Sequence, residues 1–233
     1  MGQMLVACAG RQPQLEVVAQ TDLGIDARPL IDLADVVIDF SEHSATGPLA
    51  TLCAEHGKAL VIGTTGHTDP EKELIRAVAS RIPMVWASNY SLGVNALYWL
   101  ARKAAEILGT GFDIEIVEMH HRHKVDAPSG TAKELVRRIA RVRGLDPAAA
   151  VRHGREGLVG ARGAGEIGMH ALRGGSIVGE HRAHFLADGE EIVLEHRALD
   201  RDILVRGALR AARWLLADRP AGRYDMGDVL RLA

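Results

Sequence analysis

Aromatic residues are scarce in this chain, with three Phe, three Trp and three Tyr making up 4% of its 233 residues. Proteins that bind single-stranded nucleic acid stack bases on aromatic side chains, so this scarcity argues against that class. The formal net charge is −2, whereas phosphate binding needs a basic face. We therefore expect no nucleic-acid partner.

Cysteine is also rare, because Cys8 and Cys53 are the two in the sequence, and they form no metal-ligand pattern. A reducing, cytoplasmic compartment is therefore expected. No apolar run approaches the ~20 residues that span a bilayer, and no basic flank precedes an apolar stretch at the N-terminus. We expect no membrane segment and no signal peptide. The 47% hydrophobic content is enough for one or two buried cores.

The first half of the chain alternates short apolar runs with helical patterns. Strands are expected over residues 15–21, 36–40, 59–62 and 83–87, and helices over 45–56, from 69 onward, and over 94–108. For the second of these helices, Asp69 is the expected N-cap, with Pro70 at the first helical position. Continuous apolar strands separated by helices are typical of a parallel sheet covered on both faces.

The second half has a different pattern, which predicts an α+β domain with a mixed or antiparallel sheet. The sequence from Thr131 to Glu134 is typical of a capping box that opens a helix, and Gly144 ends that helix. Asp188-Gly189 predicts a hairpin turn. Residues 154–175 are rich in glycine and arginine and are expected to form a long connection or an oligomer loop. The other elements expected here are a strand near 114–116, hairpin strands over 181–187 and 191–198, and a helix over 203–217.

The run from His120 to Lys124 packs three histidines, an arginine and a lysine into five consecutive positions. An imidazole can deliver a proton near neutral pH, and a lysine can hold a carboxylate or stabilise negative charge. The backbone N–H groups of Ser129, Gly130 and Thr131 come just before an expected helix, where they would bind an anion. These residue types predict a site that binds a small dicarboxylate and protonates it.

Two alternative interpretations of this run are weaker. A solvated basic loop is common on protein surfaces, but this run follows a strand and precedes a capped helix, where α/β proteins build their sites. A zinc site at His121 and His123 would lack a third ligand with metal spacing, and the adjacent Arg122 and Lys124 would repel the cation. We expect no metal.

Polar turns follow three of the expected strands. The turns are Asp39-Phe40-Ser41, Gly63-Thr64-Thr65-Gly66 and Asn89-Tyr90-Ser91. Because the carboxyl ends of parallel strands meet at one edge of a sheet, these turns predict a rim that binds the ribose and nicotinamide of a dinucleotide. Asp22 closes the first expected strand, where dinucleotide folds place an acid on the adenosine ribose. An ordinary turn aspartate is the alternative there.

The sequence from Glu118 to Ala132 resembles the signature of the 4-hydroxy-tetrahydrodipicolinate reductase family, formerly called dihydrodipicolinate reductase, of lysine and diaminopimelate synthesis. Shorter segments along the whole chain match the same pattern in order. These segments are 36–41, 61–66, 89–95, 155–157, 177–181 and 224–226. The resemblance implies a Rossmann-like parallel sheet with a second α+β domain. It places the dinucleotide-binding domain at 1–90 plus 206–233, and the substrate-binding and oligomerisation domain at 91–205.

The resemblance also implies roles for individual residues. His120 would donate the proton, and Lys124 would bind substrate and stabilise charge. A substrate carboxylate would be held by His121, Gly130 and Thr131. The nicotinamide side of the cofactor would be lined by Phe40, Ser41, Gly63, Thr64, Thr65, Asn89 and Tyr90. Members of the family usually form a homotetramer through the sheet of the second domain.

Two departures from the family pattern concern the cofactor. Met1-Gly2 aligns with the end of a Gly-x-x-Gly-Arg-Met-Gly loop that cradles the pyrophosphate, and the strand and glycines before it are not in this sequence. Leu23 follows Asp22 at a position where members that tolerate NADPH tend to carry arginine. The additional phosphate of NADPH would lack that partner, so we expect NADH to be preferred over NADPH.

Three functions follow as hypotheses. NAD(P)H-dependent reduction of a cyclic imine dicarboxylate is favoured by the intact histidine–lysine run. A cofactor-deficient homologue, acting as an oligomeric binding or regulatory protein, is favoured by the missing glycine loop. A related two-domain dehydrogenase would act on a small acid or imine that lacks the second carboxylate.

Overall fold

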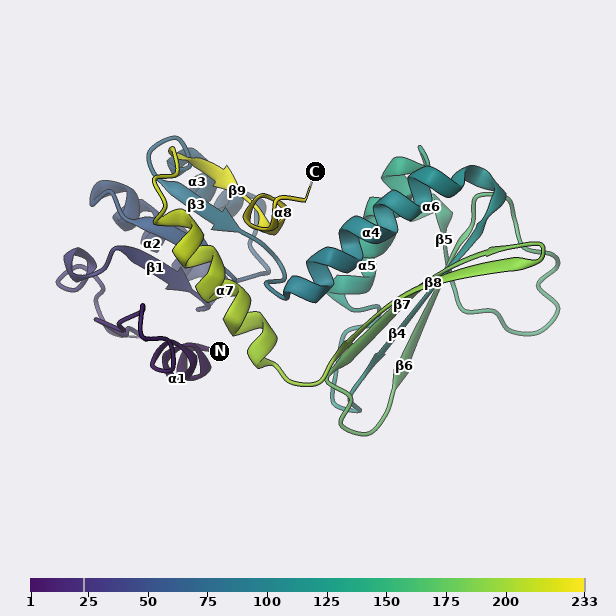
Figure 1. Ribbon diagram of the computed structural model, residues 1–233, viewed down its shortest axis with the longest axis horizontal. Coiled ribbons are helices and arrows are strands. Elements are labelled where there is room, and N and C mark those ends of the chain that lie inside the picture. Colours follow the sequence, from purple (N-terminus) through teal and green to yellow (C-terminus); the bar gives the residue numbers. More distant parts are fainter. Residues whose placement is uncertain (23, 233) are drawn as a thin grey trace. The chain divides into compact units, whose positions relative to one another are not determined.

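The structure, a computed structural model, describes residues 1–22 and 24–232 and separates into two compact units. The first unit comprises Met1–Leu92 and Asp202–Ala233, and the second comprises Gly93–Arg201 (Figure 1). Each unit has its own sheet and its own hydrophobic core.

The first unit contains a four-stranded parallel sheet in the order β1-β2-β3-β9. Its strands are β1 Val36–Asp39, β2 Ala59–Ile62, β3 Pro83–Trp86 and β9 Gly222–Tyr224. All residues of β2 are buried, as expected for a strand covered on both faces. The Rossmann-like parallel sheet is therefore confirmed, although β9 comes from a polar C-terminal stretch in which no strand was predicted.

Helices cover both faces of this sheet (Figure 1). They are α1 Gly2–Ala9, α2 His43–Glu55, α3 Asp69–Val78, α7 Asp202–Leu215 and α8 Met226–Leu230, with a short 3-10 turn η1 at Ile31–Leu33. Ile62 packs with Ile75 in the core under α2 and α3. Its neighbour Val61 packs with Leu209 in the core under α1 and α7. Successive residues of β2 therefore enter opposite cores, as the strand period of two requires.

The second unit contains a five-stranded mixed sheet in the order β5-β6-β4-β7-β8. Its strands are β4 Asp113–His120, β5 Val151–His153, β6 Ile167–Arg173, β7 Gly179–Ala187 and β8 Glu190–Ala198. β4 pairs in parallel with β6 and antiparallel with β7, and β7 and β8 form an antiparallel hairpin. The predicted mixed sheet and the Asp188-Gly189 turn are confirmed, and Gly189 has the positive φ (87°) that favours glycine.

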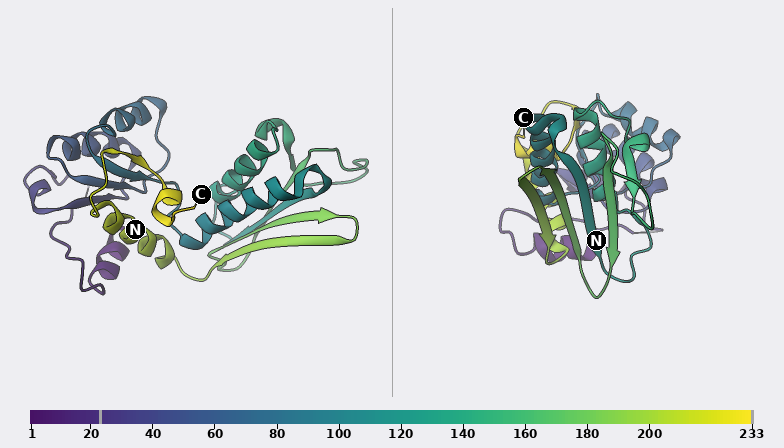
Figure 2. Two further views of the ribbon diagram at one scale, coloured as in Figure 1. Left: turned by 45° about the horizontal axis from the view of Figure 1, so that its top comes forward. Right: turned by 90° about the vertical axis from the view of Figure 1, so that its right-hand side faces the viewer.

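Two helices pack on one face of the second unit's sheet (Figure 2). The helical elements of this unit are α4 Leu92–Leu108, α5 Gly130–Val142, α6 Pro147–Ala150 and the 3-10 turn η2 Gly109–Gly111. Leu97 of α4 and Ile139 of α5 pack with Phe185 of β7 in the core between helices and sheet. Within residues 1–22 and 24–232, no helix is both long and apolar enough to cross a membrane.

The strand predicted over residues 15–21 is wrong. That segment is irregular, although Leu15 packs against the core of the first unit. A strand needs a neighbour for its backbone N–H and C=O groups, and within the described residues β1 pairs with β2 alone. The apolar pattern of 15–21 therefore reflects packing without a strand ladder.

The connection predicted over residues 154–175 is also partly wrong, because its second half forms β6. Ile167 and Met169 of this strand are buried in the core of the second unit. The glycine-rich composition of the segment obscured the strand, because glycine is depleted in strands.

Two helices begin at different caps from those predicted. The N-cap of α3 is Thr68 rather than Asp69, and the N-cap of α5 is Ser129 rather than Thr131. In each helix the hydroxyl accepts a hydrogen bond from the backbone N–H three residues ahead. The residues predicted as caps are already inside the first turn.

Candidate active site

His120 is the last residue of β4, and its imidazole is held by Glu118 on the same strand. Nδ1 of His120 lies 2.6 Å from Oε2 of Glu118. The Glu118 side chain is fully buried, and that of His120 is 12% exposed. An ionised carboxylate can only accept, so Nδ1 of His120 is the donor and carries a hydrogen. The other ring nitrogen, Nε2, is therefore the one that could carry and transfer a proton.

Glu118 is held in turn by groups from two other segments. Both terminal nitrogens of Arg173 on β6 donate to its carboxylate, each at 2.8 Å. The backbone N–H of Ser129 donates to Oε1 at 3.0 Å. Burial opposes ionisation of Glu118, but the hydrogen bonds from Arg173, His120 and Ser129 outweigh it and lower the pKa of this carboxyl. Glu118 is therefore a fixed anion behind the histidine.

His181 on β7 forms the wall beside His120. The two rings meet edge to face, with centroids 5.2 Å apart and planes at 75°. Nε2 of His181 lies 2.9 Å from the Ser129 hydroxyl oxygen. Burial, with the nearby His120 ring, lowers the pKa of His181 to about 3. His181 is therefore neutral over the physiological range and acts as a polar surface against which the His120 ring packs.

The pKa of His120 is set by opposing neighbours. Burial lowers it, and Lys124 and Arg173 lower it too, while the hydrogen bond to Glu118 raises it. The net shift is downward. The protonated ring is therefore a stronger acid than an ordinary histidine, which suits a group that must give up its proton.

Lys124 lies in the connection between β4 and α5, and this connection is attached to the same arginine. The ammonium of Lys124 donates to Asp126 at 2.6 Å. The backbone carbonyl of Asp126 accepts from Arg173 at 2.8 Å. Arg173 thus holds both the carboxylate behind His120 and the segment that carries Lys124.

The other predicted substrate residues lie on either side of this connection. Nε2 of His121 lies 3.4 Å from a guanidinium nitrogen of Arg201. Gly130 and Thr131 are the first residues of α5. Open space surrounds Gly130, since an added Cβ would meet no atom within 4 Å. An anion at this helix N-terminus would meet backbone N–H groups and the positive end of the helix dipole.

In the first unit, Asp39 organises the turn after β1. Its side chain is buried, and Oδ1 accepts from the Ser41 backbone N–H at 2.9 Å and from the Ser41 hydroxyl at 2.5 Å. Oδ2 accepts from the Thr46 hydroxyl at 2.6 Å. These bonds hold the exposed Ser41 at the carboxyl edge of the parallel sheet.

The turns after β2 and β3 meet the first turn through Phe40. A Cβ on Gly63 would lie 2.2 Å from the Phe40 ring, so glycine is required there. The Phe40 and Tyr90 rings pack with centroids 5.8 Å apart. Tyr90 is buried, and its hydroxyl lies 2.8 and 2.9 Å from the carbonyl oxygens of Ile62 and Val85. The side chain of Tyr90 is therefore a support for these turns rather than an exposed polar group.

The remaining predicted cofactor residues differ in exposure. Thr64 is buried, and its hydroxyl lies 3.5 Å from a backbone carbonyl of the first turn, while Thr65 is exposed. Asn89 closes its own turn by accepting from a backbone N–H at 2.8 Å. Asp22 is exposed in an irregular stretch. Leu23, on which the prediction of NADH preference depends, lies outside the described residues.

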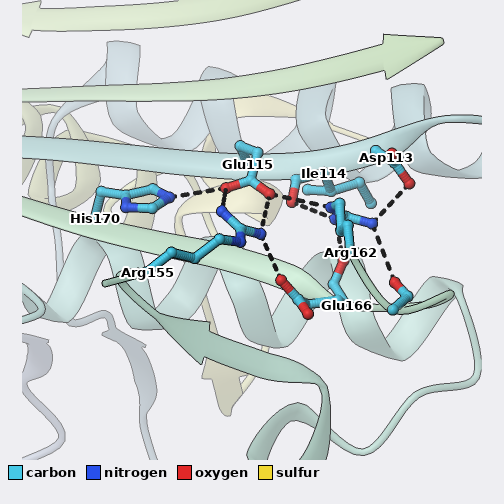
Figure 3. Close-up of polar contacts among 8 residues, drawn as sticks. Asp113, Ile114, Glu115, Arg155, Arg162, Glu166 and His170 are labelled. Carbon is cyan, nitrogen blue, oxygen red and sulfur yellow. Dashed lines mark hydrogen bonds and ion pairs between the residues drawn. The ribbon is translucent and has the colours of Figure 1, made fainter. Parts of the chain in front are cut away.

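A second polar cluster lies on the face of the second unit's sheet opposite to α5 (Figure 3). Glu115 accepts from both terminal nitrogens of Arg155, at 2.8 and 3.1 Å, from Arg162 at 3.1 Å and from Nε2 of His170 at 2.8 Å. Arg155 also pairs with Glu166. Burial opposes ionisation, but these donors lower the pKa of Glu115 to about 2. The cluster ties the connection before β6 to β4.

Neither cluster predicts a metal centre. In the part of the chain that the structure describes, no group of three or more His, Cys, Asp or Glu side chains could hold a metal ion.

The sequence reasoning missed the residues that hold His120, namely Glu118, Arg173 and His181. Glu118 had a local signal, because residues two apart on a strand share a face. Arg173 was assigned to a connection, and the apolar Ile167 and Met169, two positions apart, were the sequence signal for a strand there. His181 opened a predicted hairpin strand, but nothing in its sequence indicated which strand would pair with it.

Comparison with known proteins identifies the family of the chain. Residues 1–90 match the family described as dihydrodipicolinate reductase, N-terminus, and residues 93–230 match its C-terminal counterpart. A 4-hydroxy-tetrahydrodipicolinate reductase of Akkermansia muciniphila is 49% identical over 233 residues, covering 100% of this chain and 94% of the relative. One of Psychrobacter arcticus is 45% identical over 227 residues, covering 97% of this chain and 79% of the relative.

A solved structure gives the same answer. The dipicolinate-bound dihydrodipicolinate reductase of Paenisporosarcina sp. TG-14 is similar with a TM-score of 0.79 and 26% identity, covering 96% of this chain and 92% of that one. Both halves of the sequence and the fold therefore agree with the resemblance in the histidine run. The chain belongs to the dihydrodipicolinate reductase family.

Proposed function

We propose that this chain reduces a cyclic imine dicarboxylate, 4-hydroxy-tetrahydrodipicolinate, to tetrahydrodipicolinate with a pyridine nucleotide, as a step of lysine and diaminopimelate biosynthesis. The observation that carries the proposal is the His120 imidazole, which is fixed by a buried carboxylate next to the Lys124 connection and the N-terminus of α5. Family membership supports the reaction class, and the dipicolinate bound by the Paenisporosarcina relative supports a dicarboxylate ligand.

The residues of the second unit would bind and protonate the substrate. Lys124 and the Gly130-Thr131 turn would orient its carboxylates, with His121 beside them. His120 would protonate the enamine left after reduction of the conjugated ring carbon. Overall, one hydride and one proton are added to the substrate and one water leaves. General acid catalysis of this kind contributes roughly 10²–10⁴-fold to a rate.

The residues of the first unit fit a dinucleotide. The bound cofactor would supply the hydride from its nicotinamide ring. Ser41 and Thr65 are exposed at the carboxyl edge of the sheet, where α/β proteins bind nucleotides. The buried Nε2 of His67, in the turn after β2, has no hydrogen-bond partner within residues 1–22 and 24–232. A buried polar atom left unpaired in this way fits a ligand that completes its hydrogen bonds.

We infer NADH as the preferred form of the cofactor. The inference rests on Asp22, at a sequence position where dinucleotide folds carry an acid for the adenosine ribose, and on the Leu23 position, where the sequence has no cation to bind an additional phosphate. Measuring kcat/KM with NADH and with NADPH tests it directly. A preference for NADPH would contradict it.

We also propose a homotetramer joined through the sheet of the second unit. On the face opposite to α5, Leu172 is 46% exposed and Val193 is 43% exposed. Apolar side chains on an open sheet face favour burial against another sheet. Light scattering of the purified protein would give the mass of the assembly.

The function is tested by assaying NADH oxidation with the cyclic imine dicarboxylate in wild type and in His120→Ala. We expect the substitution to lower kcat by roughly 10²–10⁴-fold, because the proton donor is lost. His170→Ala is the matched control, since His170 also pairs with a glutamate of β4 but on the opposite face. It should keep kcat.

Three outcomes would overturn the proposal. Full turnover by His120→Ala would remove this residue from the reaction. Wild-type protein without turnover, and without enhanced NADH fluorescence on titration, would indicate a cofactor-deficient binding protein instead. Turnover on compounds with a single carboxylate, at the same kcat/KM, would favour a related dehydrogenase.

A further inference from the structure

We propose that Glu118 and Arg173 form a positioning pair for the proton transfer: Glu118 keeps hydrogen on Nδ1 of His120, so that Nε2 delivers the proton, and Arg173 holds Glu118 and limits its effect on the imidazole. The proposal rests on the proposed role of His120 as proton donor. It assigns both residues a task through His120 rather than on the substrate.

The geometry leaves Glu118 a single arrangement. An ionised carboxylate has about four acceptor positions. Here Oε2 accepts from His120 and Arg173, and Oε1 accepts from Arg173 and the Ser129 backbone N–H. Each position is filled, and the side chain is fully buried. Glu118 therefore cannot rotate away or accept water without losing a hydrogen bond.

The position of the imidazole is defined on its other side as well. A Cβ added to Gly179, the first residue of β7, would lie 3.1 Å from Nε2 of His120 and 3.4 Å from Cδ2. The ring is thus held at Nδ1 and has room at Nε2 only because glycine is there. A flip of the imidazole ring would move Nδ1 away from Glu118. One acceptor position of the carboxylate would then lose its hydrogen bond.

The charges around the ring come from each element packed against it. Glu118 lies on its own strand, Arg173 on β6, His181 on β7 and Lys124 on the following connection. His181 stays neutral, because its pKa is about 3. Glu118 therefore stabilises the protonated ring, while the two cations oppose protonation.

Glu118 and Arg173 carry opposite charges, so replacing each one distinguishes a positioning role from a merely structural role. Glu118→Gln and Arg173→Gln each break the same ion pair, so a structural role predicts the same effect from both. Positioning predicts opposite shifts in the pH profile of kcat/KM, which reports the ionisation of the free enzyme. The profile is measured from about pH 5 to about pH 9, across the range in which histidine titrates.

For Glu118→Gln we expect the decline of kcat/KM with rising pH to move to lower pH, because the protonated ring loses its counter-ion. Turnover at neutral pH should fall by about 10- to 100-fold, less than in His120→Ala, because the imidazole remains. For Arg173→Gln the decline should move to higher pH, because an opposing cation is removed. Glu118→Asp keeps the charge and should restore the wild-type profile, though not the full rate.

Glu115→Gln is the matched control, since Glu115 pairs with arginine and histidine on the opposite face of the sheet. Its profile should be that of wild type. A direct readout of the ring tautomer comes from heteronuclear NMR of the imidazole nitrogens in wild-type protein, which needs no variant to fold. We expect hydrogen on Nδ1 of His120 in the neutral ring.

Shifts of both glutamine variants in the same direction, or hydrogen on Nε2 in the neutral wild-type ring, would overturn the pairing. In either case His120→Ala would still lose kcat by roughly 10²–10⁴-fold if the proposed function is right. Loss of the positioning role is therefore distinguishable from loss of the reaction.

Discussion

Strand β4 carries two glutamates, Glu115 and Glu118, whose carboxylates are paired with similar groups on opposite faces of one sheet. Each is ionised, each accepts from both terminal nitrogens of an arginine, and each contacts a histidine. Their odd separation along the strand sends one side chain toward α5 and the other to the outer face. The types of residue that contact them would therefore not distinguish the roles of the two glutamates.

The partners of the two glutamates differ in whether they have further ion pairs of their own. Around Glu115, Arg155 is also paired with Glu166, and Arg162 is also bound to Asp113 at 2.6 Å. This network keeps most of its bonds when one member is lost. Around Glu118 each N–H group fills one acceptor position, and among the described residues no second carboxylate contacts Arg173.

The two clusters differ in their connectivity, and we propose that the Glu118 cluster is the functional one. The Glu115 cluster is redundant and fixes a long connection. The Glu118 cluster has no spare partner and ends on an imidazole that is 12% exposed.

The largest expected difference is in stability after removal of the carboxylates. Glu118→Ala should lower the free energy of unfolding by about 3–5 kcal/mol, because it breaks an ion pair whose carboxylate is fully buried and leaves the half-buried Arg173 without its counter-ion. Glu115→Ala should cost about 1–3 kcal/mol, because its arginines keep other partners. Urea unfolding of both variants measures the difference. An equal or larger loss in Glu115→Ala would show that redundancy does not protect the outer cluster.

Much of the fold could be predicted, because local patterns determined it. The bounds of β2 agree with its apolar run, and the hairpin of β7 and β8 followed from its Asp-Gly turn. β6 was missed because its burial depends on pairing with β4, a strand that comes much earlier in the sequence. Such pairing has no signature in the segment itself.

The candidate site also contains residues that local sequence predicts and residues that depend on strand pairing. His120 and Lys124 could be proposed from the sequence because their functional groups lie in one contiguous run. Arg173 could not, because it is 55 residues from Glu118 and reaches it only through the register of β6 on β4. His181 likewise faces His120 only because β7 pairs with β4 in one register. The residues proposed to bind and protonate the substrate could therefore be predicted from the sequence, whereas the residues that hold them could not.

Each cluster also contains a glycine that makes room for its polar groups, and these glycines can be compared. A Cβ on Gly168 would lie 1.7 Å from Oε2 of Glu115 and 2.3 Å from its Cδ. Gly168→Ala should therefore displace Glu115 and cost about 1–3 kcal/mol of stability with kcat unchanged. Gly179→Ala should instead crowd the His120 ring and lower kcat by roughly 10- to 100-fold, because small displacements of catalytic groups are costly.

Unfolding curves and turnover of both alanine variants test this contrast. If Gly179→Ala kept full turnover, Nε2 of His120 would not be the atom that needs the space. A turnover loss in Gly168→Ala that matched the loss in Gly179→Ala would remove the functional distinction between the two faces.

The smallest expected effects are in the dependence of stability on pH. The pKa of Glu115 is about 2 in the folded protein, below the ~4.3 of an unfolded chain. The unfolded state therefore binds protons first as the pH falls, and the stabilisation by Glu115 is present above about pH 4.3 and is lost toward pH 2. The difference in unfolding free energy between wild type and Glu115→Gln should shrink over that window and stay constant above it.

For Glu118→Gln the difference from wild type should change over two windows, because His120 titrates beside it. The pKa of Glu118 is also lowered, which gives an acid window of the same sign. The pKa of His120 is lowered too, so below about pH 6.5 the unfolded state gains a proton first and stability falls as the pH drops. Loss of Glu118 lowers the pKa of His120 further and deepens this second decline. A difference that stays flat between about pH 7 and about pH 5 would mean that Glu118 does not act on the imidazole, and the two glutamates of β4 would then be equivalent.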